Sequence, residues 1–76
     1  KVAQVLRENC EIALGVWTPT GTLYAAFVRR FGNLCNDRSF SELLFSIALS
    51  AGYPVGKDKG RTSPKANSVW GFENLK

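Results

Sequence analysis

The sequence predicts an α+β domain in which three helices come first and a β-hairpin closes the chain. Three segments, 2–14, 18–31 and 40–51, place apolar residues at the spacing of an amphipathic helix. Two short extended segments, 53–55 and 68–75, flank a stretch that is basic and has no apolar periodicity. Three helices followed by a hairpin with a basic loop is the element order of a winged helix, a helix-turn-helix core with a C-terminal β-hairpin wing.

The first predicted helix begins at Val2 and runs to Leu14, where Gly15 ends it at a C-cap position. Its apolar residues form one broad face, and charged residues occupy the opposite face. The residues of this apolar face that we expect in the core are Val5, Leu6, Cys10, Ile12 and Ala13. Val16 and Trp17 then predict the first strand of a three-stranded sheet.

The second predicted helix starts at Thr18 and Pro19, because threonine is a preferred N-cap residue and proline fits the first helical turn. It runs to about Phe31 and is stopped by Gly32 and Asn33. Its core-facing stripe is rich in aromatic residues and consists of Leu23, Tyr24, Phe27 and Phe31.

The third predicted helix opens with a capping box, in which Ser39 and Glu42 each accept a hydrogen bond from the backbone amide of the other. It runs from Phe40 to about Ala51 and is closed by Gly52. One face is expected in the core and carries Phe40, Leu43, Leu44, Ile47, Ala48 and Ala51.

This helix is the second of the helix-turn-helix pair, which makes it the candidate recognition helix. Its other face is therefore the one expected to meet the DNA bases. Ser41 and Ser46 lie on that face, and serine hydroxyls hydrogen-bond several bases with little discrimination. Phe45 and Leu49 share the face. Three interpretations of these two side chains are possible: contact with thymine methyl groups, contact with another protein, or packing beneath the wing.

Most of the net charge of +4 comes from residues 56–66, the predicted wing loop. Four basic residues against the single acid Asp58 give this loop a charge of +3, and they are Lys57, Lys59, Arg61 and Lys65. Such a concentration favours a polyanionic partner, and the loop suits phosphate contact. Arg38, just before the third helix, is predicted to contact a phosphate near the helix N-terminus. The alternative is a solvated loop whose lysines only maintain solubility.

Two aromatic residues of the last strand, Trp70 and Phe72, are two positions apart and therefore share one face of the sheet. We expect both of them in the core.

Enzymatic chemistry is not indicated by any motif. The chain has no histidine, no phosphate-binding glycine-rich loop and no acidic metal cluster, so we expect neither catalysis nor a cofactor. Two cysteines, Cys10 and Cys35, are too few for a zinc site. We expect two buried thiols, with a single disulfide as the alternative. No apolar run reaches the ~18 residues of a membrane span, so a cytoplasmic location without a membrane partner is expected.

Three stretches resemble the C-terminal domain of the primase–helicases of phages, plasmids and poxviruses. Residues 22–27 (TLYAAF) are similar to that family's LY-x-A-[YF] helix, and 38–53 to its sF-x-x-x-[LM]…GY helix. Residues 69–76 (VWGFENLK) are similar to its closing v-W-x-G-x-x-L strand, with one residue fewer between Trp and Gly. The resemblance implies a winged helix that binds duplex DNA, at a replication origin or without sequence preference. It also implies that the domain belongs to a larger protein with ATP-dependent helicase and primase activity. Any oligomer is expected to form through that parent protein.

A single domain, residues 1–76, is expected, and we expect it to be a piece of a longer protein because the chain begins at Lys1 and contains no methionine. Two other functions remain open. One is a winged-helix protein-interaction module that uses Phe45 and Leu49 as its apolar anchor. The other is a freestanding DNA-binding regulator.

Overall fold

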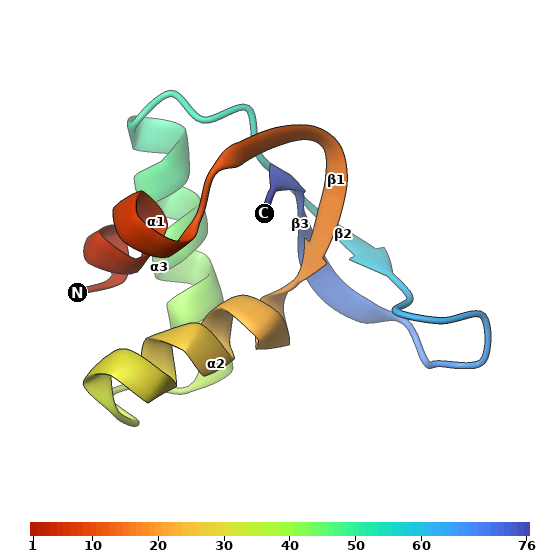
Figure 1. Cartoon of the computed structure of the whole chain (residues 1–76), viewed down its shortest axis with the longest axis horizontal. Helices are drawn as coiled ribbons and strands as arrows, with labels where there is room; N and C mark the ends of the chain where they lie inside the picture. Colours follow the sequence, from red (N-terminus) through yellow and green to blue (C-terminus); the bar gives the residue numbers. More distant parts are fainter.

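The computed structural model describes all 76 residues as an α+β fold of three helices and one three-stranded antiparallel sheet. The helices lie together on one side of the sheet, and a hairpin projects beyond them (Figure 1). The elements in chain order are α1 (Val2–Asn9), β1 (Ile12–Pro19), α2 (Thr20–Phe31), α3 (Asp37–Ser50), β2 (Gly56–Gly60) and β3 (Val69–Leu75).

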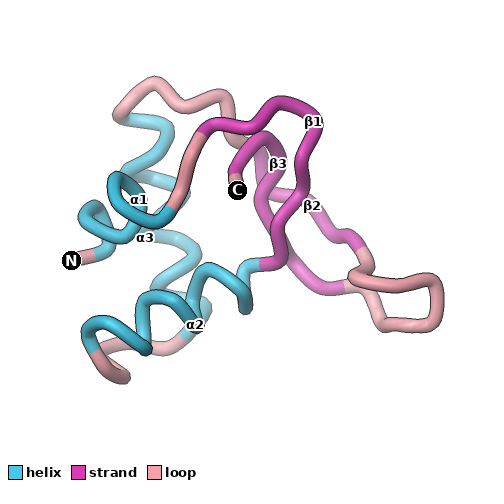
Figure 2. The backbone as a smooth tube through the Cα atoms, viewed as in Figure 1, coloured by secondary structure: helices cyan, strands magenta, loops and turns pink.

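The sheet has the order β1-β3-β2, so the last strand of the chain lies between the other two. Figure 2 shows the three strands together, and the loop that joins β2 to β3 lies at the far end of the hairpin. The β1–β3 register is irregular between Ile12 and Trp17. Gly15, with φ of 81°, lies in this irregular stretch, and its backbone N–H donates to Asn74 Oδ1 at 2.9 Å.

Helix α1 ends at Asn9, so the prediction that it extends to Leu14 is wrong. Cys10 already has extended backbone, with φ of −122° and ψ of 152°. The apolar spacing at Ile12 and Ala13 does continue a helical period, but both residues belong to β1, and Ile12 pairs with Leu75 at the end of β3. Ile12 is half-exposed rather than part of the core.

Thr18 and Pro19, which were expected to start the second helix, belong to β1 instead. The Thr18 hydroxyl donates to the Leu75 carbonyl oxygen at 2.6 Å, which ties it to β3 and leaves no side-chain cap at α2. Helix α2 therefore starts at Thr20 after Pro19. Its end at Phe31 is confirmed, with the Gly32 N–H donating to the Val28 carbonyl at 2.8 Å.

Helix α3 is capped by Asn36 and not by the Ser39–Glu42 box. The Asn36 side chain accepts a hydrogen bond from the Ser39 backbone N–H at 2.8 Å, and the helix begins at Asp37. Asparagine is among the best N-cap residues, and it reaches the same third amide that a serine cap would use. Ser39 consequently lies inside the first turn.

The first strand of the hairpin lies later in the sequence than the extended segment predicted for it. Strand β2 occupies Gly56–Gly60 instead of 53–55, and it pairs with β3 from Gly56↔Glu73 to Gly60↔Val69. The loop is thus residues 61–68. The predicted last strand, 68–75, agrees with β3 to within one residue.

The core lies between the helices and the inner face of the sheet. Its largest fully buried side chains include Phe27 and Phe40, whose ring centroids are 5.1 Å apart, and Phe72 from β3. Two residues expected in the core are exposed instead, namely Leu43 on α3 and Ala51 at the C-cap of that helix. The buried apolar residues are Val2, Val5, Leu6, Leu23, Phe27, Phe40, Leu44, Ala48, Val55, Phe72 and Leu75.

Both cysteines are free thiols. Cys10 and Cys35 are half-buried rather than buried, and the pKa of Cys10 is raised because burial disfavours the thiolate. None of the helices combines the length and the apolar character that crossing a membrane requires.

Candidate nucleic-acid interface

Two of the predicted basic residues are held on a strand. Lys57 and Lys59 belong to β2, not to a loop, and they pair with Phe72 and Trp70 of β3. Residues two apart on a strand project from the same face, so both lysines lie on the face of the sheet that bears Phe72. Their ammonium groups are therefore positioned by the sheet.

Each of these lysines lies over an aromatic ring. The Lys57 Nζ is 5.7 Å from the centroid of Phe45, and the Lys59 Nζ is 5.3 Å from the centroid of Trp70. These are cation–π distances, and at exposed side chains such contacts contribute about 0.5–1 kcal/mol each. The rings orient the lysines and leave their N–H donors free for an anion.

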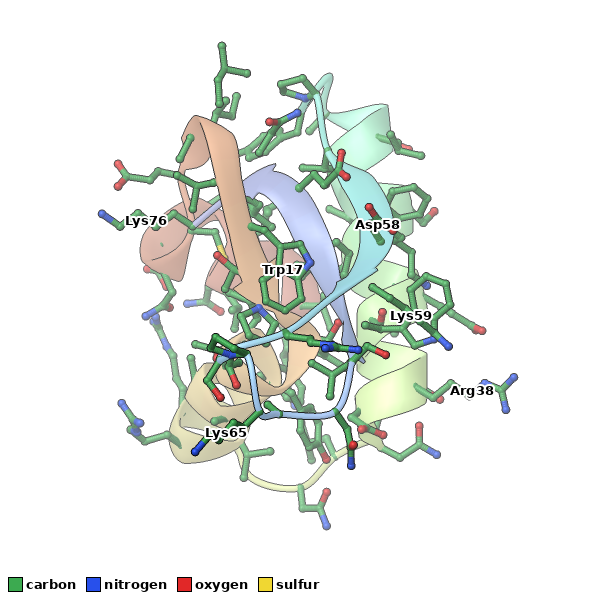
Figure 3. All side chains as sticks on the ribbon, turned by 90° about the vertical axis from the view of Figure 1, so that its right-hand side faces the viewer. Trp17, Arg38, Asp58, Lys59, Lys65 and Lys76 are labelled. Carbon is green, nitrogen blue, oxygen red and sulfur yellow. The ribbon has the colours of Figure 1, made fainter.

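The other two wing cations, Arg61 and Lys65, lie in the exposed loop 61–68 at the far end of the hairpin. Figure 3 looks at this end of the molecule and shows Lys65 on one side of the hairpin and Lys59 with Arg38 on the other. The predicted basic residues therefore divide between two sides of the wing.

Arg38 is the second residue of α3, where the sequence had placed it in the preceding loop. It is exposed and has no carboxylate partner, since the one ion pair of the fold joins Arg30 of α2 to Glu8 of α1. The wing cations are likewise unpaired. Arg38, Lys57 and Lys59 thus form a group of free cations at the junction of α3 and the hairpin.

The serines of α3 do not share one exposed face. Ser41 is only 7% exposed, so the prediction that it faces outward is wrong, whereas Ser46 is exposed. Helix α3 also carries the exposed acids Asp37 and Glu42 near its N-terminus. A carboxylate repels phosphate, so the outward face of α3 is poorly suited to lie along a DNA backbone by itself.

Phe45 packs beneath the hairpin. Its ring centroid is 6.3 Å from that of the buried Phe72, and Lys57 covers it from β2. Of the interpretations that the sequence left open for Phe45, packing under the wing is the one that the geometry gives. Leu49, by contrast, is half-exposed.

Trp70 is 53% exposed, so the prediction that it belongs to the core is wrong, while Phe72 is fully buried as predicted. The two rings do occupy one face of the sheet. Phe72 faces the helices, but Trp70 lies farther along the hairpin, where the helical layer no longer covers the strand (Figure 1).

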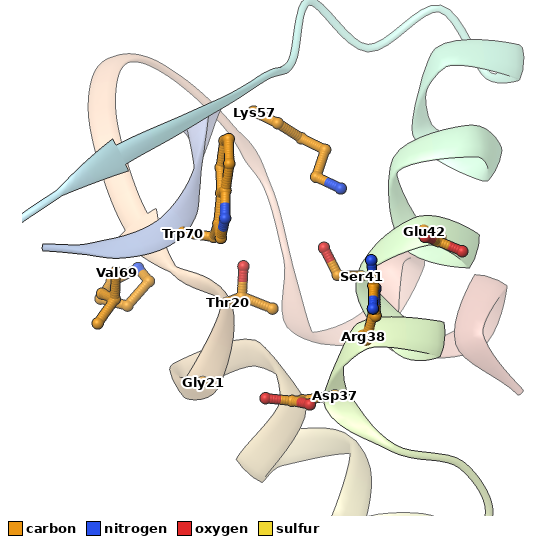
Figure 4. A pocket seen from close by; sticks show the side chains of 10 residues that line it. Thr20, Gly21, Asp37, Arg38, Ser41, Glu42, Lys57, Val69 and Trp70 are labelled. Atoms are coloured by element: carbon orange, nitrogen blue, oxygen red, sulfur yellow. The ribbon is translucent and has the colours of Figure 1, made fainter.

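A pocket of about 730 Å³ lies between Trp70 and the N-terminal turns of α2 and α3. Figure 4 shows one face of the Trp70 ring turned across the pocket toward Ser41 and Arg38, with the Lys57 ammonium group above. Five elements contribute to it, namely β1, α2, α3, β2 and β3, which is why no local sequence pattern predicts it. Its lining residues are Pro19, Thr20, Gly21, Asp37, Arg38, Ser41, Glu42, Lys57, Val69 and Trp70.

The opposite face of the sheet is built around Trp17, whose indole lies on the glycines of the hairpin and whose Nε1 donates to the Asp58 carbonyl oxygen at 3.4 Å. Asp58 and Glu73 also lie on this face. A hydrogen bond to Asp58, desolvation and the neighbouring negative charge together raise the pKa of Glu73. This face is uncharged or acidic, so an anion would bind on the other one.

No protein-family model, curated protein or solved structure matches the chain. No three acidic or thiol side chains are grouped in a way that would hold a metal ion.

Proposed function

We propose that the chain is a winged-helix domain that binds duplex DNA through the β2–β3 hairpin and the N-terminal turn of α3. The order α1-β1-α2-α3-β2-β3 and the strand order β1-β3-β2 are compatible with a winged helix in which α2 and α3 would form the helix-turn-helix. The observation that carries the proposal is the group of unpaired cations Arg38, Lys57 and Lys59 beside α3.

Phosphate contact is the chemistry that these side chains supply. Basic groups that neutralise phosphates release condensed counterions from DNA, and this term dominates binding without sequence preference. Lys57 and Lys59 are fixed on a strand, and Arg61 and Lys65 add two further exposed cations in the loop at the end of the hairpin. The hairpin is therefore expected to lie against the DNA backbone.

Base recognition is expected to be weak. Ser46 is exposed on α3, where its hydroxyl would be able to hydrogen-bond several bases, and the half-exposed Leu49 suits a thymine methyl group. Asp37 and Glu42 on the same helix oppose close approach to phosphates. The domain is consequently proposed to bind duplex DNA of many sequences with similar affinity.

The resemblance to the C-terminal domain of the primase–helicases extends this proposal to a cellular role. In such a protein the domain would position an ATP-dependent helicase on DNA, and the catalytic sites would lie elsewhere in the parent. A ring of several copies raises the effective concentration of each domain, so weak individual binding suffices.

The test is a fluorescence-anisotropy titration of the domain against random-sequence duplex DNA at several salt concentrations. About three to five phosphate contacts predict a log–log slope of roughly −3 to −4.5. The triple variant Lys57→Gln/Lys59→Gln/Arg61→Gln is expected to lose most of the affinity and to flatten the slope by about 0.9 for each lost contact.

The matched control is Arg29→Gln, because Arg29 is an exposed, unpaired cation of α2 on the far side of the domain from the hairpin. It should leave the slope unchanged. Equal binding by the triple variant and the unmodified domain would refute the hairpin interface. An interaction module anchored by Leu49 would instead show salt-insensitive partner binding that Leu49→Ala abolishes.

A further inference from the structure

Trp70 is the largest apolar side chain that the fold leaves without a covering partner on one of its faces. Lys59 contacts its ring at 5.3 Å from the centroid but does not line the pocket. The face of the ring turned toward α3 borders the pocket (Figure 4). An exposed indole beside free cations is the usual platform on which proteins stack an unpaired base.

Two cations border the pocket on the sides nearest to this ring. Lys57 enters from β2 and Arg38 from the first turn of α3, and neither has a carboxylate partner. Figure 4 shows both charged groups directed into the space that Trp70 faces. A phosphate attached to a stacked nucleoside would lie within the field of both cations.

The floor of the pocket contains a buried hydroxyl group that has no hydrogen-bond partner. Thr20 is only 9% exposed, its Oγ1 makes no hydrogen bond, and Figure 4 shows this oxygen pointing into the pocket. Buried polar atoms are nearly always paired in folded proteins, so an unpaired one at a pocket indicates a missing partner. Ser41 supplies a second hydroxyl from the facing helix.

The pocket also holds two hydrogen-bond acceptors of the kind that read a base edge. Asp37 and Glu42 line it from α3, and carboxylates accept hydrogen bonds from the exocyclic amino groups of bases. In duplex DNA those amino groups point into the grooves or pair with the opposite strand. A base taken out of the duplex would present them inside the pocket.

We propose that this pocket binds one unpaired nucleotide at a DNA strand end or fork, with the base stacked on Trp70 and the phosphate held by Arg38 and Lys57. The inference rests on the proposed function, because it places this nucleotide beside a duplex held by the hairpin. The volume of about 730 Å³ lies within the range of pockets that hold small ligands, roughly 300–1,000 Å³.

The experiment compares three duplexes of identical sequence in the anisotropy assay. One is blunt, the second has a three-nucleotide overhang, and the third has an overhang of the same length made of abasic nucleotides. The abasic overhang carries the same phosphates without bases. We expect the natural overhang to bind at least about tenfold more tightly than the abasic one, the order of one base stack.

Trp70→Leu is expected to abolish this difference, so that the variant binds the natural and the abasic overhang with equal affinity. Its fold is checked by circular dichroism. In ¹H–¹⁵N spectra of the unmodified domain, the natural overhang should shift the indole N–H signal of Trp70 and leave that of Trp17 in place. Trp17 is the internal control because it lies on the opposite face of the sheet.

The outcomes separate the inference from the function on which it rests. Equal affinity for the natural and abasic overhangs would overturn the nucleotide pocket and leave duplex binding intact. Preference for the natural overhang without any blunt-duplex binding would support the pocket and overturn the duplex proposal. Free deoxyadenosine monophosphate that shifts Trp70 as strongly as the overhang does, at equal concentration, would overturn the assignment to a strand end.

Discussion

The indole of Trp17 lies against the backbone of Gly71. A Cβ atom at Gly71 would stand 2.5 Å from Cε2 and Nε1 of Trp17, and one at Gly60 would stand 2.8 Å from the same ring. Trp17 belongs to β1, Gly71 to β3 and Gly60 to β2, so a single side chain spans the whole sheet. The absence of side chains at both glycines is what allows this contact.

Gly71→Ala is therefore expected to destabilise the domain by about 2–3 kcal/mol, the cost of overpacking a site that cannot relax. The added methyl group would meet the Thr18 carbonyl oxygen at 2.6 Å as well as the indole, and backbone does not move aside easily. Urea unfolding measures the change.

Gly21→Ala is the matched control, since a Cβ at this position in α2 meets nothing within 4 Å. It should raise the stability by about 0.5–1 kcal/mol, because alanine favours the helix. If Gly71→Ala were as stable as the unmodified chain, the contact with Trp17 would not exist in solution.

Asn36→Ala is expected to cost about 1 kcal/mol of unfolding free energy, because it removes the side chain that accepts from the Ser39 N–H. Ser39→Ala changes the stability by less than about 0.5 kcal/mol, since the Ser39 hydroxyl is exposed and caps nothing. Thermal unfolding of both variants decides between the two capping schemes. A larger loss at Ser39 than at Asn36 would restore the capping box.

Glu73→Gln is expected to stabilise the domain at neutral pH. The pKa of Glu73 is higher in the folded chain than in the unfolded chain, so the folded state binds a proton more tightly. The contribution of Glu73 to the stability of the fold is therefore favourable below the ordinary glutamate pKa of about 4.3. It is lost as the pH rises through the pKa of Glu73 in the folded chain. Glutamine keeps a donor for Asp58 and removes the repulsion.

The melting temperatures of Glu73→Gln and the unmodified domain should differ at pH 7 and converge below about pH 4, where both carry a neutral side chain at this position. Glu11→Gln is the control, because Glu11 is exposed and has no charged partner. A pH-independent difference for Glu73→Gln would contradict the coupling to Asp58.

The Cys10 thiol is expected to alkylate more slowly in the folded domain than in the chain unfolded in urea. Burial raises its pKa, and the thiolate is the reactive form. In a Cys35→Ser background, the rate of reaction with iodoacetamide should reach its midpoint at a higher pH in the folded state. Identical midpoints would show that Cys10 is solvated like a free thiol.

The helical faces could be read from the sequence wherever burial follows local periodicity. Helix α2 ends at the predicted Phe31, and α3 buries Phe40, Leu44 and Ala48 as its spacing indicates. The error at the first helix has a non-local cause. Residues after Asn9 leave the helix to pair with β3, and their own spacing fits a helix as well as a strand.

The candidate site could be predicted only in part. The basic cluster is visible in the composition, and the structure brings Arg38 and Lys57 to one pocket at the α3–hairpin junction. The sequence did not predict that Trp70 is exposed. The alternation of side chains along a strand indicates which face of the sheet a residue occupies, but it does not indicate how far the helices cover that face. The pocket depends on Thr20 of α2 and Trp70 of β3 lining one space, although they lie far apart in the sequence.

Strand β3 is the only partner of both β1 and β2, although it follows both of them and all three helices in the chain. Its bonds to β1 span most of the chain, as the Thr18–Leu75 and Gly15–Asn74 pairs show with separations of 57 and 59 residues. A growing chain can therefore form its helices early, but its sheet has to wait until synthesis has delivered β3. Closing so long a loop is entropically slow, so the rate at which the domain matures is set by the arrival of one strand.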